Sequence, residues 1–173
     1  MQVAPALSNE DELVTETRTF QAFFEAERDG LFGALVLITG DTHEAEEVTQ
    51  DAFLAVWERW DRVRAMDNSA GYLYRTAMNV FRRRRRRAAL AVRRAVGLVQ
   101  AEDAFAAADT RQVVAKALAG LSRRQRAALV LTELLGFTSE EAGLTLGIRP
   151  VTVRVLASQG RAAMKRSLER SDE

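Results

Sequence analysis

Residues 71–87 read GYLYRTAMNVFRRRRRR, a segment that begins as an amphipathic helix with aromatic residues and ends in six consecutive arginines. Between Arg75 and Arg94 there are nine arginines and no acidic residue, in a chain with 25 basic and 24 acidic residues. The rest of the chain therefore has 16 basic residues against 24 acidic ones, a balance of −8. Concentrated positive charge attracts polyanions, and with Tyr72 and Tyr74 beside it the segment predicts a nucleic-acid surface. A solvated helix face is the other interpretation of such a run.

The composition excludes several classes of function. The chain has no cysteine, so it has no disulfide and no thiolate metal site, and its single histidine, His43, cannot form a multi-histidine site. No apolar run approaches the roughly 20 residues of a transmembrane helix, and the acidic N-terminus lacks a signal-peptide pattern. The acidic residues have no histidine or cysteine partner, and no glycine-rich phosphate loop is present. We therefore expect a cytoplasmic protein that is not an enzyme, has no metal or other cofactor and does not insert into a membrane.

The N-terminal half predicts two helices after a tail. Residues 1–17 are acidic and include Pro5, so we expect a flexible tail. Over residues 19–39 large apolar residues recur at spacings of three, four and seven, which indicates a helix that ends at Gly40. A second helix is expected over residues 41–60, capped by Asp41 or Thr42, with an inward stripe of Ala45, Val48, Ala52, Ala55 and Val56.

The second helix also carries an acidic stripe. Between Asp41 and Glu58 there are six acidic residues and no arginine or lysine. The stripe also holds Leu54, with Trp57 nearby, and its other members are Glu47, Gln50 and Asp51. Such a surface can dock a basic partner helix. An ordinary outward-facing helix surface fits the pattern equally well.

The C-terminal half predicts a linker followed by short helices. The turn Asp67-Asn68-Ser69 precedes the arginine-bearing helix, for which Ser69 is the expected N-cap. Residues 88–109 are alanine-rich, and we interpret their middle as a linker. Helices are then expected over residues 110–121, from Ser122 to about residue 136 with a core-like Leu134, from Thr138 or Ser139 to about residue 146, and from Pro150 to about residue 166.

The last two helices have the pattern of a helix-turn-helix. Gly143 is a small residue where two helices must approach closely, and Gly147 supplies the turn. In such a motif the first residues of the second helix reach base edges. The outward residues there are Arg149, Val151, Thr152, Val155, Ser158 and Gln159, and Arg154 and Arg161 add positive charge. A helical hairpin without a role in DNA binding is the alternative.

These patterns predict an all-α fold of two small helical domains. The first domain is expected over residues 18–92 and the second over residues 111–170. Residues 93–110 join them as a linker.

The order of these parts resembles the bacterial RNA polymerase sigma factors of the extracytoplasmic-function (ECF) group, sigma-70 family, which keep only domains two and four. The resemblance covers roughly residues 20–90 and 112–168. In the N-terminal part it is carried by FEAERDGLFGALVLITGD, HEAEEVTQDAFLAVWERWDRV and GYLYRTAMNVFRRRRRR. In the C-terminal part it is carried by LAGLSRRQRAALVLTELLGFTSEEAGLTLGI and by TVR at 152–154. The two predicted domains then correspond to sigma region 2 and sigma region 4.

The resemblance implies a role for each segment. The segment that binds core RNA polymerase matches Glu47, Gln50, Asp51, Phe53, Leu54 and Trp57. Residues 61–69 match the loop that holds a base flipped from the −10 promoter element. The implied −10 DNA-binding residues are Asn68, Ser69, Tyr72, Arg75, Asn79, Arg82, Arg83, Arg84 and Arg86. The implied −35 DNA-binding residues are Arg149, Val151, Thr152, Arg154, Val155, Ser158, Gln159 and Arg161.

The chain departs from the family pattern in its recognition helix. Leu156 and Gln159 stand where arginines are common in the family, and Val155 adds another apolar group. Fewer charged donors mean fewer phosphate or guanine contacts, so we expect a weak or unusual −35 contact. An apolar face is also a possible contact surface for an anti-sigma factor.

The implied function is promoter recognition and transcription initiation at stress- or signal-responsive genes. The implied partners are core RNA polymerase, promoter DNA and an anti-sigma factor, and the free chain is expected to be monomeric. A stand-alone helix-turn-helix regulator is the first alternative, although such proteins usually dimerise and no heptad-rich dimerisation helix is present. A protein that titrates a partner is the second.

Overall fold

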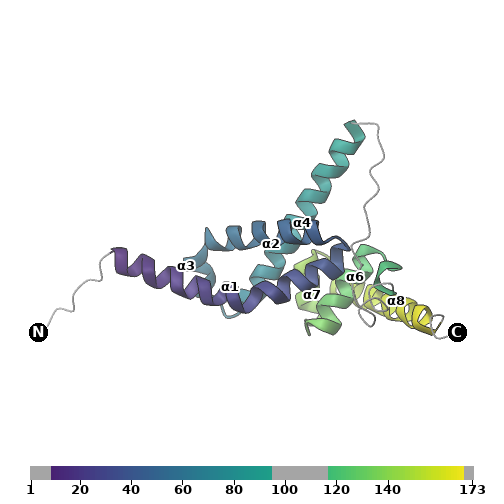
Figure 1. The fold of residues 1–173 in the computed structure, drawn as a ribbon. Helices are drawn as coiled ribbons and strands as arrows, with labels where there is room; N and C mark the ends of the chain where they lie inside the picture. The colour runs from purple at the N-terminus through teal and green to yellow at the C-terminus, as the bar shows by residue number, and fades with distance from the viewer. Residues whose placement is uncertain (1–8, 95–116, 170–173) are drawn as a thin grey trace, which may run out of the picture.

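The computed structural model describes the backbone of residues 9–94 and 117–169, and the side chains of residues 19–88 and 117–169. Within these ranges the regular elements are all helical and no strand occurs (Figure 1). They form an N-terminal module of α1 (Asn9–Thr39), α2 (Thr42–Trp57), α3 (Trp60–Arg64) and α4 (Ser69–Arg94). The C-terminal module contains α6 (Arg123–Leu129), the π-helical turn η1 (Val130–Leu134), α7 (Ser139–Leu146) and α8 (Pro150–Glu169). The predicted all-α class is confirmed.

Local capping explains where several helices begin. At the start of α2 the Asp41 side chain accepts a hydrogen bond from the Glu44 amide, with Oδ1 and N 2.9 Å apart. Ser122 before α6 and Thr138 before α7 each form a capping box with the residue three positions on. These bonds join near neighbours in the chain, which is why the sequence predicts them.

Three helix boundaries differ from the predicted ones. α1 begins at Asn9, so residues 9–17 of the predicted tail are helical. No proline or glycine interrupts that stretch, and acidic residues in the first turns suit a helix N-terminus. α4 continues to Arg94 and includes two residues of the predicted linker, whose remainder lies outside the described residues. α2 ends at Trp57, and α3 then occupies part of the predicted 61–69 loop.

The helix predicted to follow Ser122 changes its geometry halfway. The Leu135 amide donates to the Val130 carbonyl oxygen, five residues back, at 3.0 Å. This π-helical turn takes more residues per turn and so changes the direction of the side chains after it. Leu134, predicted to lie in the core, is 62% exposed, whereas the buried residues of the segment include Ala128, Leu129 and Leu131.

An aromatic cluster holds α2 against α1. The ring of Phe20 lies 5.2 Å from that of Trp60, and the rings of Phe24 and Phe53 are 4.7 Å apart, both edge to face. The Trp60 indole also donates a hydrogen bond to the Thr19 hydroxyl at 3.2 Å. Edge-to-face pairs contribute about 0.5–1.5 kcal/mol beyond their buried area. The cluster therefore determines which face of α2 remains available to α4 and to solvent.

The two modules pack on each other. α4 lies against α7 and α1 against α6, and buried side chains from both modules form one continuous core. Tyr74 on α4 and Phe137 before α7 are in edge-to-face contact, with centroids 5.5 Å apart. Burial, reinforced by the Glu27 carboxylate, raises the pKa of Tyr74 to about 12. The helix-turn-helix is thus held beside the arginine-bearing helix, with the far end of α4 projecting from the body (Figure 1).

Candidate nucleic-acid and partner interface

One face of α4 carries a stripe of exposed polar side chains, here called the basic stripe: Arg75, Asn79, Arg83 and Arg86. Spacings of four, four and three place these residues on one side of a helix. The half-buried Tyr72 lies beside the stripe, with the Arg75 guanidinium 5.4 Å from the centre of its ring. Arginines hold phosphates and aromatic rings stack on bases, so this face has the groups that single-stranded DNA requires.

Asn68, rather than the predicted Ser69, caps α4. Its Oδ1 accepts a hydrogen bond from the Gly71 amide at 2.6 Å, and Ser69 is half-buried. A Cβ atom at position 71 would lie only 2.7 Å from the Asn68 amide nitrogen, so a larger residue there would push the Asn68 side chain out of its present position. The side-chain carbonyl oxygen of Asn68 is therefore occupied by the cap, and the residue as a whole is exposed in the turn before α4.

The outward face of α2 carries the predicted polymerase-binding residues. Gln50 and Asp51 are exposed, Leu54 and Trp57 are 58% and 41% exposed, and Glu47 is half-exposed; we call these five residues the docking stripe. Phe53 is different, because it is only 4% exposed and packs among the phenylalanines of α1. Its prediction as a contact residue is therefore wrong. Its ring instead packs between α2 and α1.

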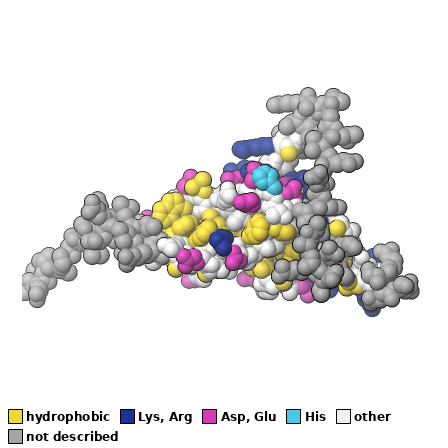
Figure 2. Space-filling model, in the orientation of Figure 1, with side chains coloured by type: hydrophobic (Ala, Val, Ile, Leu, Met, Phe, Trp, Pro, Cys, Tyr) yellow, Lys and Arg dark blue, Asp and Glu magenta, His cyan; other side chains and the backbone are white. Residues whose placement is uncertain are grey.

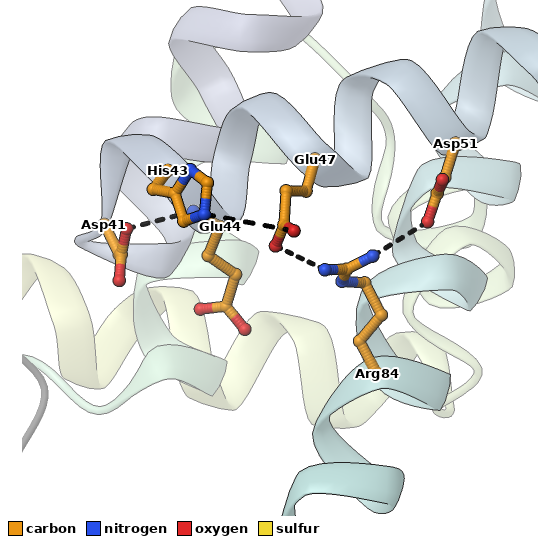
Figure 3. A network of polar contacts seen from close by, with 6 residues as sticks. All are labelled: Asp41, His43, Glu44, Glu47, Asp51 and Arg84. Atoms are coloured by element: carbon orange, nitrogen blue, oxygen red, sulfur yellow. Dashed lines mark hydrogen bonds and ion pairs between the residues drawn. The ribbon is translucent and has the colours of Figure 1, made fainter. Parts of the chain in front are cut away.

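Arg84 joins α4 to the docking stripe (Figure 3). Its Nη1 donates to Asp51 Oδ2 at 2.9 Å and its Nη2 donates to Glu47 Oε2. Burial alone would lower the pKa of Arg84, but the hydrogen bonds to Glu47 and Asp51 outweigh it and raise that pKa. His43 approaches the other oxygen of Glu47, with Nε2 and Oε1 3.9 Å apart. Figure 2 shows acidic and basic side chains side by side where α4 rises from the body of the molecule.

Arg82 faces the other module. Its guanidinium donates to the Leu146 carbonyl oxygen at the C-terminus of α7, and also to Asn79 Oδ1. Burial, with a contribution from the positive charge of Arg86, lowers the pKa of Arg82. A cation at a helix C-terminus is favourable, so this predicted DNA-binding residue stabilises the contact between modules in this arrangement.

α7 and α8 form the predicted helix-turn-helix. Gly147 between them adopts φ 65°, the left-handed conformation that glycine accepts most readily. A Cβ atom at Gly143 would lie 2.9 Å from the Ile148 carbonyl oxygen, so the predicted close approach is confirmed. Val153 on α8 is fully buried and faces back into the module. The first turns of α8 are thereby presented on the surface.

The outward side of α8 mixes apolar and paired charged groups. Val151 and Val155 are 53% and 49% exposed. Arg154 Nη1 lies 3.5 Å from Glu140 Oε1, and Arg161 forms an ion pair with Glu133. The other predicted −35 residues are the exposed Arg149, Ser158 and Gln159 and the half-buried Thr152. The structure thus brings all eight predicted residues onto α8 or the turn before it.

Sequence reasoning missed an apolar groove of about 630 Å³ between the modules. Leu37 of α1 and Leu129 of α6 line it, together with Leu134, Met164 and Leu168. Its walls come from segments far apart in the chain, and Leu134 reaches it only because of the π-helical turn. No local pattern could have revealed the groove.

The described part of the chain offers neither a membrane-spanning helix nor a cluster of metal ligands. No helix in residues 9–94 or 117–169 is long and apolar enough to cross a membrane. In the same part of the chain, no group of three or more histidine, cysteine or acidic residues is arranged to hold a metal ion.

Comparison with protein families gives two adjacent matches. The family model Sigma-70 region 2 matches residues 23–91, and the family model Sigma-70, region 4 matches residues 111–164. A curated relative, the ECF RNA polymerase sigma factor SigE of Mycolicibacterium smegmatis, is 29% identical over 150 residues, or 79% of this chain. The chain spans 56% of the length of that relative.

Two solved structures share the fold. The sigma factor RpoE of Bartonella quintana, in complex with the anti-sigma factor NepR, has a TM-score of 0.74 at 22% identity; the match covers 88% of this chain and 98% of that one. CnrH, in complex with the cytosolic domain of CnrY, has a TM-score of 0.60 at 24% identity, covering 89% of this chain and 90% of that one. At these identities the likeness supports the arrangement of helices.

Proposed function

The chain belongs to the sigma-70 family, within its ECF group, and on that premise we propose that it binds core RNA polymerase and directs transcription initiation at promoters. Its mechanism is binding rather than catalysis. We propose that the chain acts in the cytoplasm and that it is a monomer when it is not bound to polymerase. The proposed targets are stress- or signal-responsive genes.

One observation carries the proposal: two packed helices present surfaces of opposite charge. The docking stripe on α2 is acidic with exposed Leu54 and Trp57, and the basic stripe on α4 holds arginines and Asn79. Both lie in the module that matches region 2. We assign the docking stripe to core polymerase. The basic stripe, with Tyr72 and Asn68 beside it, is assigned to the melted −10 element.

The C-terminal module is the part of the chain that we assign to duplex promoter DNA. The first turns of α8 lie beyond a tight glycine turn, where a helix-turn-helix contacts base edges in the major groove. We assign this surface to the −35 element in duplex DNA. Phosphate contacts would position the module, and the side chains at the start of α8 would read the sequence.

A dedicated anti-sigma factor is the proposed regulatory partner. Two structurally similar proteins were solved in complexes, the sigma factor RpoE with the anti-sigma factor NepR and CnrH with the cytosolic domain of CnrY. A partner that covers the docking stripe or the first turns of α8 would block the proposed function.

Run-off transcription on genomic fragments tests the function. Purified core polymerase is assayed with and without this chain, and we expect discrete new transcripts only when the chain is present. Absence of transcripts, together with failure to co-migrate with core polymerase, would contradict the proposal. Co-migration without transcripts would support binding to core polymerase and would contradict the proposed promoter recognition.

An exposed leucine tests the docking stripe directly. Leu54→Ala should lower affinity for core polymerase about tenfold or more, because apolar anchors within a polar rim contribute most to interfaces. Leu144→Ala on α7 is the matched control, since both leucines are exposed, at 58% and 68%. Equal affinity of the two variants would show that polymerase binds elsewhere.

A further inference from the structure

The proposed polymerase surface and the proposed DNA surface meet at Arg84. This arginine belongs to the basic run of α4, yet its guanidinium bridges Glu47 and Asp51 on α2 (Figure 3). The side chains of Arg84, Glu47 and Asp51 are 33%, 40% and 49% exposed. The bridge is therefore at the surface, within reach of a partner on either helix.

We propose that Glu47 and Asp51 form a guanidinium-binding site that Arg84 occupies in the free chain and yields to a basic side chain of core polymerase. Docking then releases Arg84 toward the DNA held along α4. This inference rests on the proposed function, because it assigns the docking stripe to polymerase. It adds a competitor within the chain and a coupling between the two interfaces.

The geometry suits a guanidinium. Glu47 and Asp51 are four residues apart, so their carboxylates lie on one face of α2 and can each take one nitrogen of a planar guanidinium. A basic partner helix that docks on this face would present its cations to the same two carboxylates. Arg84 already takes one oxygen of each carboxylate, and a second cation bridging the same pair would lie close to its like charge, so one displaces the other.

The modest strength of the bridge makes the exchange possible. Exposed ion pairs contribute about 0.2–1 kcal/mol, so displacing Arg84 weakens docking only about 1.4- to fivefold. A fully buried pair would resist displacement, because breaking it would strand a charge away from water. Arg84 is thus held firmly enough to have a defined partner and loosely enough to change it.

Arg84 differs from the neighbouring arginines of α4 in its contacts. Among the described residues, Arg84 is the one arginine of residues 82–87 that forms an ion pair. Arg82 is held by the Leu146 carbonyl oxygen of α7 instead, and Arg83 and Arg86 are exposed on the basic stripe. Linkage requires the effect to be reciprocal: DNA that binds Arg84 frees the two carboxylates and favours polymerase docking.

The first experiment measures the affinity of the full-length chain for purified core polymerase by fluorescence anisotropy. Arg84→Gln should bind about 1.4- to fivefold more tightly than the unmodified chain, because the internal competitor is gone. Arg87→Gln is the matched control: it removes the same charge from an exposed residue of α4 that lies near Asp51 and Leu54 but has no ion pair among the described residues, so its affinity should change less than that of Arg84→Gln. Thermal unfolding of both variants should stay close to that of the unmodified chain.

The second experiment follows the release of Arg84 with a labelled, mixed-sequence single-stranded oligonucleotide. The slope of log affinity against log salt concentration reports how many phosphates are neutralised. On a single strand, each phosphate contact contributes about 0.7 to the size of that slope. In the polymerase complex, the slope for the unmodified chain should exceed that of Arg84→Gln by about this amount. Without polymerase the difference should be smaller, because α2 then competes with the DNA for Arg84. A slope difference of the same size in both states overturns the release of Arg84.

Leu54→Ala separates failure of this inference from failure of the proposed function. If Leu54→Ala loses polymerase binding while Arg84→Gln binds no more tightly than Arg87→Gln, the docking stripe stands and the competition by Arg84 is overturned. If Leu54→Ala binds polymerase normally, the assignment of the docking stripe fails, and the inference fails with it.

Discussion

The two helices assigned to DNA, α4 and α8, present their arginines in opposite ways. On α4, the arginines of the basic stripe have no carboxylate partner among the described residues, and the stripe follows the helix for three turns. On α8, Arg154 and Arg161 each face a glutamate, and the exposed residues near the start include Val151 and Val155. An arginine that already forms an ion pair within the chain must break that pair to bind a phosphate, so its net contribution to DNA affinity is smaller. We infer that α4 binds mainly through charge and α8 mainly through shape and apolar contact.

The difference also affects how each surface responds to conditions. Contacts with phosphates release counterions, so binding along α4 should weaken steeply with salt. Contacts of valine with base methyl groups have no such dependence, so binding through α8 should weaken less. The substitutions below test this contrast, from the largest expected effect to the smallest.

Gly143→Val should produce the largest effect and separate the two surfaces. The added side chain would push the Ile148 carbonyl away from a position 2.9 Å from Cβ, at a cost of about 2–3 kcal/mol. Duplex binding through α8 should be lost while single-strand binding along α4 remains, as measured by anisotropy with each DNA. Gly33→Ala, at an exposed glycine whose added Cβ would meet nothing within 4 Å, is the control. Loss of both activities would mean that the modules do not act separately.

Neutralising the basic stripe should come second. Arg83→Gln combined with Arg86→Gln should lower affinity for single-stranded DNA about tenfold and reduce the salt slope by about 1.4. Titration with a labelled oligonucleotide at several salt concentrations measures both quantities. An unchanged slope would show that these arginines are a solvated face and would remove the contrast with α8.

A change in the DNA tests whether apolar side chains of α8 contact thymine methyl groups. Replacing thymine with deoxyuridine in the −35 element of a promoter found by run-off transcription removes only the C5-methyl group. We expect affinity to fall about two- to threefold, because Val151 and Val155 are the exposed groups able to pack on that methyl. Val155→Ser should reduce the sensitivity to the methyl group. Equal binding of both DNAs by the unmodified chain would contradict an apolar reading.

Releasing Arg154 should have the smallest effect. Glu140→Gln removes the carboxylate 3.5 Å from the Arg154 guanidinium and should tighten duplex binding about twofold, with a slightly steeper salt slope. This variant makes α8 more like α4. Weaker binding would indicate that Glu140 positions Arg154 for its contact with DNA.

Much of the fold was predictable because its causes are local. The apolar periodicity of α1 and α2 indicates helices, and the caps at Asp41, Ser122 and Thr138 bond to amides three residues away. The close approach at Gly143 also follows from the spacing to the turn. The candidate site residues of α2, α4 and α8 lie on the helices that the sequence predicts, and their binding roles remain predictions.

The errors arose where distant segments decide the outcome. Phe53 shares the α2 sequence with the docking stripe, but the phenylalanines of α1 enclose it. Leu134 fits a core pattern until the π-helical turn redirects it. The cap at Asn68 is different, because its bond to the Gly71 amide spans only three residues and is as local as the caps that the sequence predicts.

The sequence by itself determined that this chain is helical, that its positive charge is concentrated on one helix and that it has the order of parts of a sigma factor. These properties depend on composition and on contacts within a few residues. Only the tertiary structure decided what each arginine of that helix does. Arg82 is bonded to a carbonyl 64 residues away, and Arg84 to carboxylates 33 and 37 residues away. Arg82 and Arg84 therefore make different contacts because the fold gives them different neighbours.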